Sequence, residues 1–148
     1  MFRPDLVVLR DGRPVLVAEA KGRAIEEPYH ESVVRQLQAY STSVNSPWAL
    51  LADPQKTEIY RTIDFTRPVV TFSTGEILGD EVPRHSTVIG ERTLVFVLDR
   101  WLSEIPRRRE RLVARHPELM DLANDLSNHI TTQREWWPGR PDGGRDPG

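Results

Sequence analysis

The chain has no cysteine, which excludes disulfide bonds and thiolate metal sites. It also lacks a long apolar run, because the longest one, residues 94–98, is far shorter than the roughly 20 residues that cross a bilayer. The first residues show no basic-then-apolar signal pattern. These absences predict a soluble cytoplasmic protein, and 148 residues suffice for one domain with a substantial core.

The signatures of several enzyme classes are missing as well. The four histidines show no metal-ligand spacing, which argues against zinc hydrolase chemistry. There is no Ser-His-Asp order, glycine-rich phosphate loop or Walker pattern. A formal net charge of −2 gives no global attraction to nucleic acid, so any such binding must rely on local basic patches or on metals.

The N-terminal half of the chain contains the clearest strand signals. Residues 6–10 and 14–21 are rich in Val and Leu, and Asp11-Gly12 between them is typical of a hairpin turn. Apolar residues at helical spacing predict a helix over 27–44. Further short strands are expected at 47–52, 57–63 and 69–72, with mostly loop over 73–90.

The C-terminal half is predicted to be helical. Apolar residues repeat with the helical period over 91–105, and Pro106 ends the pattern. Another helix is predicted over 117–129, with Pro117 in its first turn. We therefore predict an α/β fold: a small mixed sheet of about four or five strands flanked by helices, in a domain over 1–133. Residues 134–148 are predicted to be a disordered tail.

Two short motifs place carboxylates and an amine on neighbouring strands. Pro4-Asp5 precedes the first strand, and Glu19-Ala20-Lys21 ends the second, where Glu19 and Lys21 share a face. Asp5 joins that face if the hairpin has a three-residue loop starting at Arg10, or a bulge with the same effect. A plain two-residue Asp11-Gly12 loop would instead pair Asp5 with Ala18, on the other face.

This set of groups suits the hydrolysis of a phosphodiester. The carboxylates of Asp5 and Glu19, helped by the backbone carbonyl of Ala20, favour Mg²⁺ or Mn²⁺ over zinc. Such a metal activates a water and stabilises charge on the phosphoryl oxygens, and Lys21 would position that water or neutralise the transition state. The alternative from these residues alone is an ordinary hairpin end with a Glu-Lys pair and a strand-capping Asp.

The order Pro4-Asp5, Glu19-Ala20-Lys21, then a helix, resembles the PD-(D/E)XK nuclease superfamily. Gln36 and Tyr40 on that helix form a Q-x-x-x-Y arrangement, which resembles RecB-type members and the nuclease domains of type I restriction subunits. The resemblance covers residues 3 to about 60, and it implies a restriction-endonuclease-like core over 3–63 with a helical part over 91–130. It also implies that Gln36 and Tyr40 border the active site. Taken without it, Tyr40 is a core residue and Gln36 a solvated one.

One part of the superfamily pattern is missing. Its core begins with a helix and a strand ahead of the aspartate strand, and that helix often supplies a further acidic ligand. Met1 lies four residues before Asp5, which leaves no room for either element. An upstream start, a partner that supplies the pieces, or a non-catalytic copy would each explain this. A sheet without that strand would have an exposed apolar edge, which favours pairing with another chain.

Two further features are candidates for nucleic-acid contact. Arg107, Arg111 and Arg115 follow at four-residue spacing with Arg108 beside them, so a helix would carry them as one basic stripe that could bind DNA phosphates. A solvated helix face is the more common role of such a run. Trp136-Trp137 could stack on a base, although we favour docking of the tail on its own domain.

The leading functional prediction is a Mg²⁺- or Mn²⁺-dependent deoxyribonuclease of the restriction or repair type, in a prokaryotic setting that the resemblance implies. Its expected partners are DNA and either further copies of the chain or a restriction-system subunit. Two alternatives stay open. One is a non-catalytic DNA-binding or assembly module with the nuclease fold, and the other is a structural protein whose helical half binds a partner.

Overall fold

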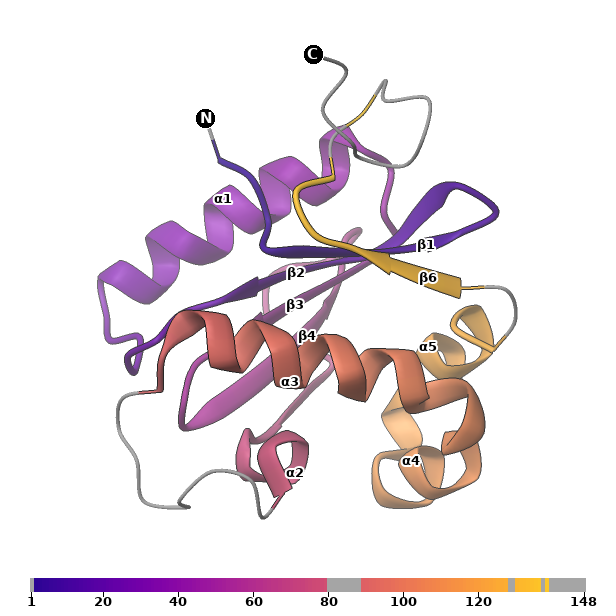
Figure 1. The fold of residues 1–148 in the computed structure, drawn as a ribbon. Helices are drawn as coiled ribbons and strands as arrows, with labels where there is room; N and C mark the ends of the chain where they lie inside the picture. Colours follow the sequence, from indigo (N-terminus) through magenta and orange to yellow (C-terminus); the bar gives the residue numbers. More distant parts are fainter. Residues whose placement is uncertain (1, 80–88, 128–129, 137, 139–148) are drawn as a thin grey trace.

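The computed structural model describes residues 2–79, 89–127, 130–136 and 138. These residues form a six-stranded mixed sheet with helices on both faces (Figure 1). In chain order the strands are β1 (Leu6–Arg10), β2 (Arg13–Ala20), β3 (Trp48–Ala52), β4 (Lys56–Arg61), β5 (Val70–Ser73) and β6 (Ile130–Gln133). In space their order is β5-β4-β3-β2-β1-β6. The α/β class is therefore confirmed, with one or two more strands than predicted.

The β1–β2 hairpin has a two-residue turn and a bulge. Asp11 and Gly12 have φ angles of 53° and 77°, as the tightest hairpin turns require. The antiparallel register shifts between Val8 and Leu9, so that Leu6 lies opposite Ala18. Of the two ways to bring Asp5 to the face of Glu19, the structure contains the bulge and not the three-residue loop.

Helix α1 (Tyr29–Ser43) connects β2 to β3, which runs parallel to β2, and it covers one face of the sheet. Its buried side chains, Val33, Leu37 and Ser41, recur at the spacing of one helix face. The helix predicted over 27–44 is thus confirmed apart from its ends. Because α1 runs back along the sheet, its first turn lies near the end of β2 and its last turn near the start of β3.

The segment predicted to be loop over 73–90 contains a short helix, α2 (Gly75–Leu78). Thr74 precedes it, and its buried hydroxyl is 2.8 Å from the hydroxyl of Thr57 on β4. Residues 80–88 of the same segment lie outside the described residues.

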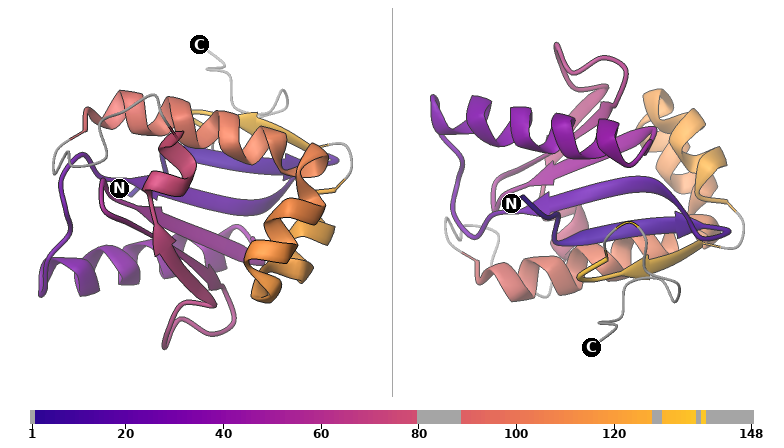
Figure 2. Two further views of the ribbon diagram at one scale, coloured as in Figure 1. Left: turned by 90° about the horizontal axis from the view of Figure 1, so that it is seen from below. Right: turned by 90° about the horizontal axis from the view of Figure 1, so that it is seen from above.

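The C-terminal half is not wholly helical, which corrects the prediction. β6 pairs antiparallel with β1 on the side away from β2. Helix α3 (Glu91–Glu104) covers the sheet face opposite α1 (Figure 2). The predicted exposed edge at β1 is therefore wrong, because residues 130–133 of the same chain cover it.

Short helices follow α3 at one end of the molecule. They are η2 (Ile105–Arg107), α4 (Arg109–Arg115), η3 (Pro117–Leu119) and α5 (Met120–Asp125). The single helix predicted over 117–129 is therefore a 3-10 turn followed by a short helix, and residues 128–129 lie outside the described residues. None of the described helices is long and apolar enough to cross a membrane.

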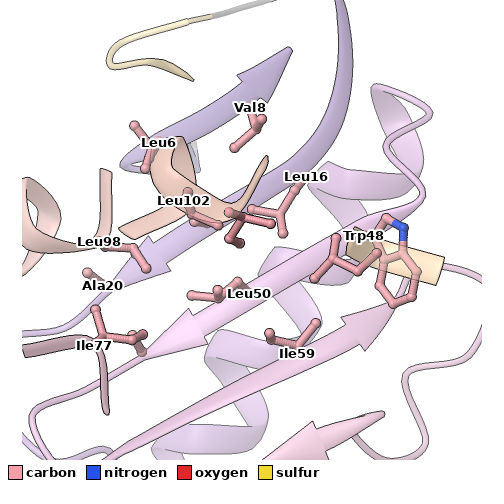
Figure 3. Close-up of a cluster of buried hydrophobic side chains, with 14 of the residues drawn as sticks. Leu6, Val8, Leu16, Ala20, Trp48, Leu50, Ile59, Ile77, Leu98 and Leu102 are labelled. Carbon is pink, nitrogen blue, oxygen red and sulfur yellow. The ribbon is translucent and has the colours of Figure 1, made fainter. Parts of the chain in front are cut away.

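The sheet separates two apolar layers. Leu6 and Val8 of β1 pack in the layer under α3, together with Leu16, Leu50, Leu98 and Leu102 (Figure 3). Val7 and Leu9 point the other way and pack in the layer under α1. Trp136, which follows β6, is buried in this second layer. Residues 134–136 therefore belong to the domain and not to the disordered tail predicted from residue 134, while Trp137 lies outside the described residues.

The end of β2 lies tightly against the start of α3. The Ile89 amide donates to the carbonyl of Gly22 at 3.0 Å. A Cβ atom at Gly22 would lie 2.8 Å from the Ile89 carbonyl oxygen, a distance that only glycine avoids. This close approach brings Glu91, the first residue of α3, towards Lys21.

Candidate functional site: a carboxylate-lysine cluster at the β1–β2 end of the sheet

The fold brings Asp5, Glu19 and Lys21 together, and we call these three residues the carboxylate-lysine cluster. Leu6 lies opposite Ala18, and continuing this register by one residue places Asp5 opposite Glu19. Both then share the α1 face of the sheet with Val7 and Val17. Lys21 follows two residues after Glu19 and returns to the same face.

Hydrogen bonds and one ion pair fix the cluster. The Asp5 Oδ2 atom accepts the Ala20 amide at 2.8 Å, which ties the residue before β1 to the end of β2. Lys21 Nζ lies 3.1 Å from Glu19 Oε2. The other carboxylate oxygen, Glu19 Oε1, is buried and accepts no hydrogen bond from the described residues. A buried carboxylate oxygen without a donor is costly, so this atom calls for a proton or a cation.

The pKa of Glu19 also reflects this burial next to a second carboxylate. The pKa of Glu19 is raised to about 8, mainly by burial and also by hydrogen bonding with the Asp5 carboxyl and by its negative charge, while Lys21 opposes the rise. Burial lowers the pKa of Lys21, but the charge and hydrogen bond of Glu19 outweigh this, so the Lys21 pKa is raised overall. Tyr29 and Glu91 act on Lys21 in the same direction as Glu19. The cluster therefore favours an extra positive charge.

This raised pKa predicts a pH-dependent stability. Below the ordinary pKa of 4.5, Glu19 is protonated in both folded and unfolded chains; between 4.5 and about 8 only the folded chain keeps the proton. Unfolding then releases a proton, so the free energy of unfolding falls as the pH rises through this window. The Glu19→Gln variant should gain roughly 3–5 kcal/mol relative to the wild type between pH 4 and pH 9.

Urea denaturation at several pH values measures this difference. The Glu118→Gln variant, which changes an exposed glutamate of η3, is the matched control and should keep the wild-type pH dependence. If the free energy of unfolding depends on pH in the same way in the wild type and in Glu19→Gln, the pKa of Glu19 is not raised.

The donor set of the cluster fits a hard divalent cation. It offers two carboxylates, and the Ala20 carbonyl points to the same side as the Ala20 amide that Asp5 accepts, because both groups of a strand residue face the same neighbour. Oxygen donors of this kind suit Mg²⁺ or Mn²⁺, which keep several water ligands. Among the described residues no cluster of three or more His, Asp and Glu side chains forms a complete cation site, so waters or a substrate phosphate would complete the shell.

Gln36 and Tyr40 form no side-chain hydrogen bond or ion pair with the cluster in the described part of the chain. The Gln36 side chain is exposed. Tyr40 lies in the last turns of α1, toward the start of β3, and its ring contacts Phe2 edge-on with centroids 5.9 Å apart. Its hydroxyl is buried without a hydrogen-bond partner in the described ranges, and burial raises its pKa, partly offset by Arg3.

A second polar group, which sequence reasoning did not find, lies on the same sheet face. Leu51 of β3 pairs with Glu19 on one side and with Glu58 of β4 on the other. The buried Glu58 carboxylate lies 2.6 Å from His30 Nε2 and accepts the Tyr60 hydroxyl at 3.2 Å. The only sequence signal was a glutamate inside a strand that is otherwise buried.

The predicted basic stripe is split between two helices. Arg107 belongs to η2, while Arg111 and Arg115 belong to α4. Arg107 and Arg108 pair with Glu104 at 4.0 and 3.1 Å, and Arg115 pairs with Glu76 at 3.4 Å. α4 lies on the α3 side of the sheet (Figure 1), so these arginines are not brought to the carboxylate-lysine cluster.

The site is thus built from three side chains predicted together, with Glu91, Glu58 and His30 nearby. Comparisons with protein-family models, with curated proteins and with solved structures found no match for this chain. The function must therefore be argued from the chemistry of the site.

Proposed function

We propose that the protein hydrolyses phosphodiester bonds of DNA at the carboxylate-lysine cluster, with Mg²⁺ or Mn²⁺ as cofactor. The observation that carries this proposal is the buried Glu19 oxygen that lacks a hydrogen-bond donor. The same carboxylate pairs with Lys21 through its other oxygen and lies opposite Asp5 in the strand register. When Glu19 is ionised, two carboxylates beside a single lysine leave negative charge that a divalent cation neutralises.

Each residue of the cluster has a role in this proposal. Asp5 and Glu19 would hold the cation, with the Ala20 carbonyl as a third oxygen donor. When bound, the cation supplies Lewis acidity, which makes a water more acidic and stabilises charge on the phosphoryl oxygens. Lys21, which is partly exposed and fixed by Glu19, would orient the attacking water or neutralise the charge that develops on the phosphate.

The chain topology supports the proposal at the point where the superfamily pattern was incomplete. A helix and a strand were expected before the aspartate strand. α3 covers the face opposite α1 and β6 flanks β1, so the C-terminal half supplies a helix and a strand beside the aspartate strand. Glu91 begins α3 and raises the pKa of Lys21, so this helix also offers an acidic side chain near the cluster. We infer a nuclease core whose first helix and strand come from the C-terminal half.

Cleavage of supercoiled plasmid DNA tests this function. Nicking is expected with Mg²⁺ or Mn²⁺ and is expected to stop with EDTA. The Asp5→Asn variant keeps a side-chain acceptor for the Ala20 amide but loses a charge, so it should need at least about tenfold more metal for half-maximal nicking. Asp11→Asn, in the hairpin turn at the far end of β1, is the matched control and should behave as wild type.

If the wild type and both variants bind DNA but none of them nicks it when metal is added, the protein is not a hydrolase. It would favour the alternative of a non-catalytic DNA-binding or assembly module. Absence of both metal binding and DNA binding would leave the structural protein. A restriction or repair setting, with further copies or a restriction-system subunit as partner, belongs to the proposal only if nicking is observed.

A further inference from the structure

A hollow opens on the α1 side of the sheet, between α1 and the segment that joins β4 to β5. Its volume is about 600 Å³, within the range of small-molecule sites. The residues on which its chemistry depends are Glu58, Tyr60, Phe65, Arg67, His30 and Gln38.

Most charges around this hollow are paired within the protein. His30 lies between Glu27 and Glu58, with nitrogen–oxygen distances of 3.0 and 2.6 Å. Arg35 and Glu31 at the rim pair at 2.5 Å. Arg67 on the β4–β5 segment is exposed and places a cation at the mouth. The hollow therefore combines two carboxylates that share His30 with a positive charge at its entrance.

An aromatic surface forms one wall of the hollow. The Phe65 ring is stacked on the Tyr60 ring, with centroids 4.7 Å apart and planes within 2° of parallel. Tyr60 is buried, and its hydroxyl donates to Glu58, which holds the stack in place. Phe65 itself is only partly buried. A rigid flat ring of this kind stacks on any planar base.

The hollow lies on the same face as the carboxylate-lysine cluster. Glu19 and Glu58 both pair with Leu51 from opposite sides, so their strands are two spacings apart, about 10 Å. This separation is of the same order as one nucleotide of an extended strand. A strand whose phosphate reaches the cluster can therefore place a neighbouring base in the hollow.

We propose that this hollow binds one unpaired nucleotide, with its base on Phe65, its base edge read by the Gln38 amide and its phosphate on Arg67. A base must leave the duplex to stack in this way, so the substrate is single-stranded DNA, a frayed end or a flipped nucleotide. The position of this nucleotide beside a scissile bond rests on the proposed function, but its binding does not.

Titration with thymidine 5′-monophosphate and deoxyadenosine 5′-monophosphate, followed by NMR chemical shifts of the labelled protein, tests the inference. Millimolar or tighter binding is expected, with shifts around residues 60–67. Phe65→Leu, which keeps apolar volume without a ring, should weaken both nucleotides at least about fivefold. Arg67→Ala should weaken the nucleotides but not thymidine, which has no phosphate.

Ile63→Ala is the matched control, because Ile63 belongs to the same segment and is 91% exposed. It should bind as wild type. The two proposals fail separately: a wild-type protein that binds both nucleotides but never nicks DNA with metal contradicts only the nuclease proposal. The inference would be overturned if neither nucleotide shifts any signal at about 10 mM. It would also be overturned if Phe65→Leu and Arg67→Ala both bind the nucleotides as the wild type does.

Discussion

Replacing Lys21 by alanine is expected to lower metal-dependent DNA nicking by about 10²–10³-fold. The ammonium group is held 3.1 Å from Glu19 at the end of β2, so in the proposed mechanism it is already positioned where the phosphoryl charge develops. Removing it takes away that stabilisation. Single-turnover plasmid cleavage at saturating metal measures the change, because it separates chemistry from metal binding.

The chain offers a matched control for this experiment. Lys56 on β4 is the other lysine of the sequence, and Lys56→Ala changes the net charge by the same amount. It should change nicking by less than about threefold if only general attraction to DNA is lost. Equal losses in Lys21→Ala and Lys56→Ala would show that charge, and not position at the cluster, governs the activity.

The second large effect is expected on stability. Trp136→Ala should lower the free energy of unfolding by about 3–5 kcal/mol. Trp136 is only 7% exposed and packs with Val7 and Leu9 of β1 in the layer under α1. Its removal would empty a large volume where the chain beyond β6 is anchored. Urea denaturation followed by circular dichroism measures the loss.

Trp136→Phe serves as the conservative companion, because it keeps an aromatic ring and should cost clearly less than the alanine variant. A change of less than about 1 kcal/mol in Trp136→Ala would mean that this segment does not contribute to the core and that its docking is wrong.

The sequence predicted the elements whose signals are local. The Val- and Leu-rich strands at 6–10 and 14–21 and the helix after them were found because their periodicity needs no knowledge of the rest of the fold. The bulge between Val8 and Leu9 could only be named as an option, since it depends on how β1 aligns with β2. β6 was missed because residues 130–133 form a strand through pairing with β1, and four residues carry little pattern of their own.

The candidate site, like the fold, could be predicted only where its residues are linked by local sequence spacing. Asp5, Glu19 and Lys21 could be grouped in advance because a hairpin converts their spacing into proximity. Gln36 and Tyr40 rested on the resemblance alone: the Gln36 side chain is exposed, and the Tyr40 ring packs on Phe2, so their part in the site stays a prediction. The contact of His30 with Glu58 joins residues 28 positions apart through the packing of α1 on β4, and no local pattern announces it.

The position of β1 between β2 and β6 has a consequence for how the molecule comes into being. One neighbour of β1, strand β2, is made immediately after it, whereas the other, β6, is made after all the other strands of the sheet. Until then the strand next to Asp5 has an open flank with unsatisfied amides and carbonyls. The nascent polypeptide thus carries the carboxylate-lysine cluster on an incomplete sheet, and a molecule that ends before residue 130 is expected to aggregate more readily than the full chain.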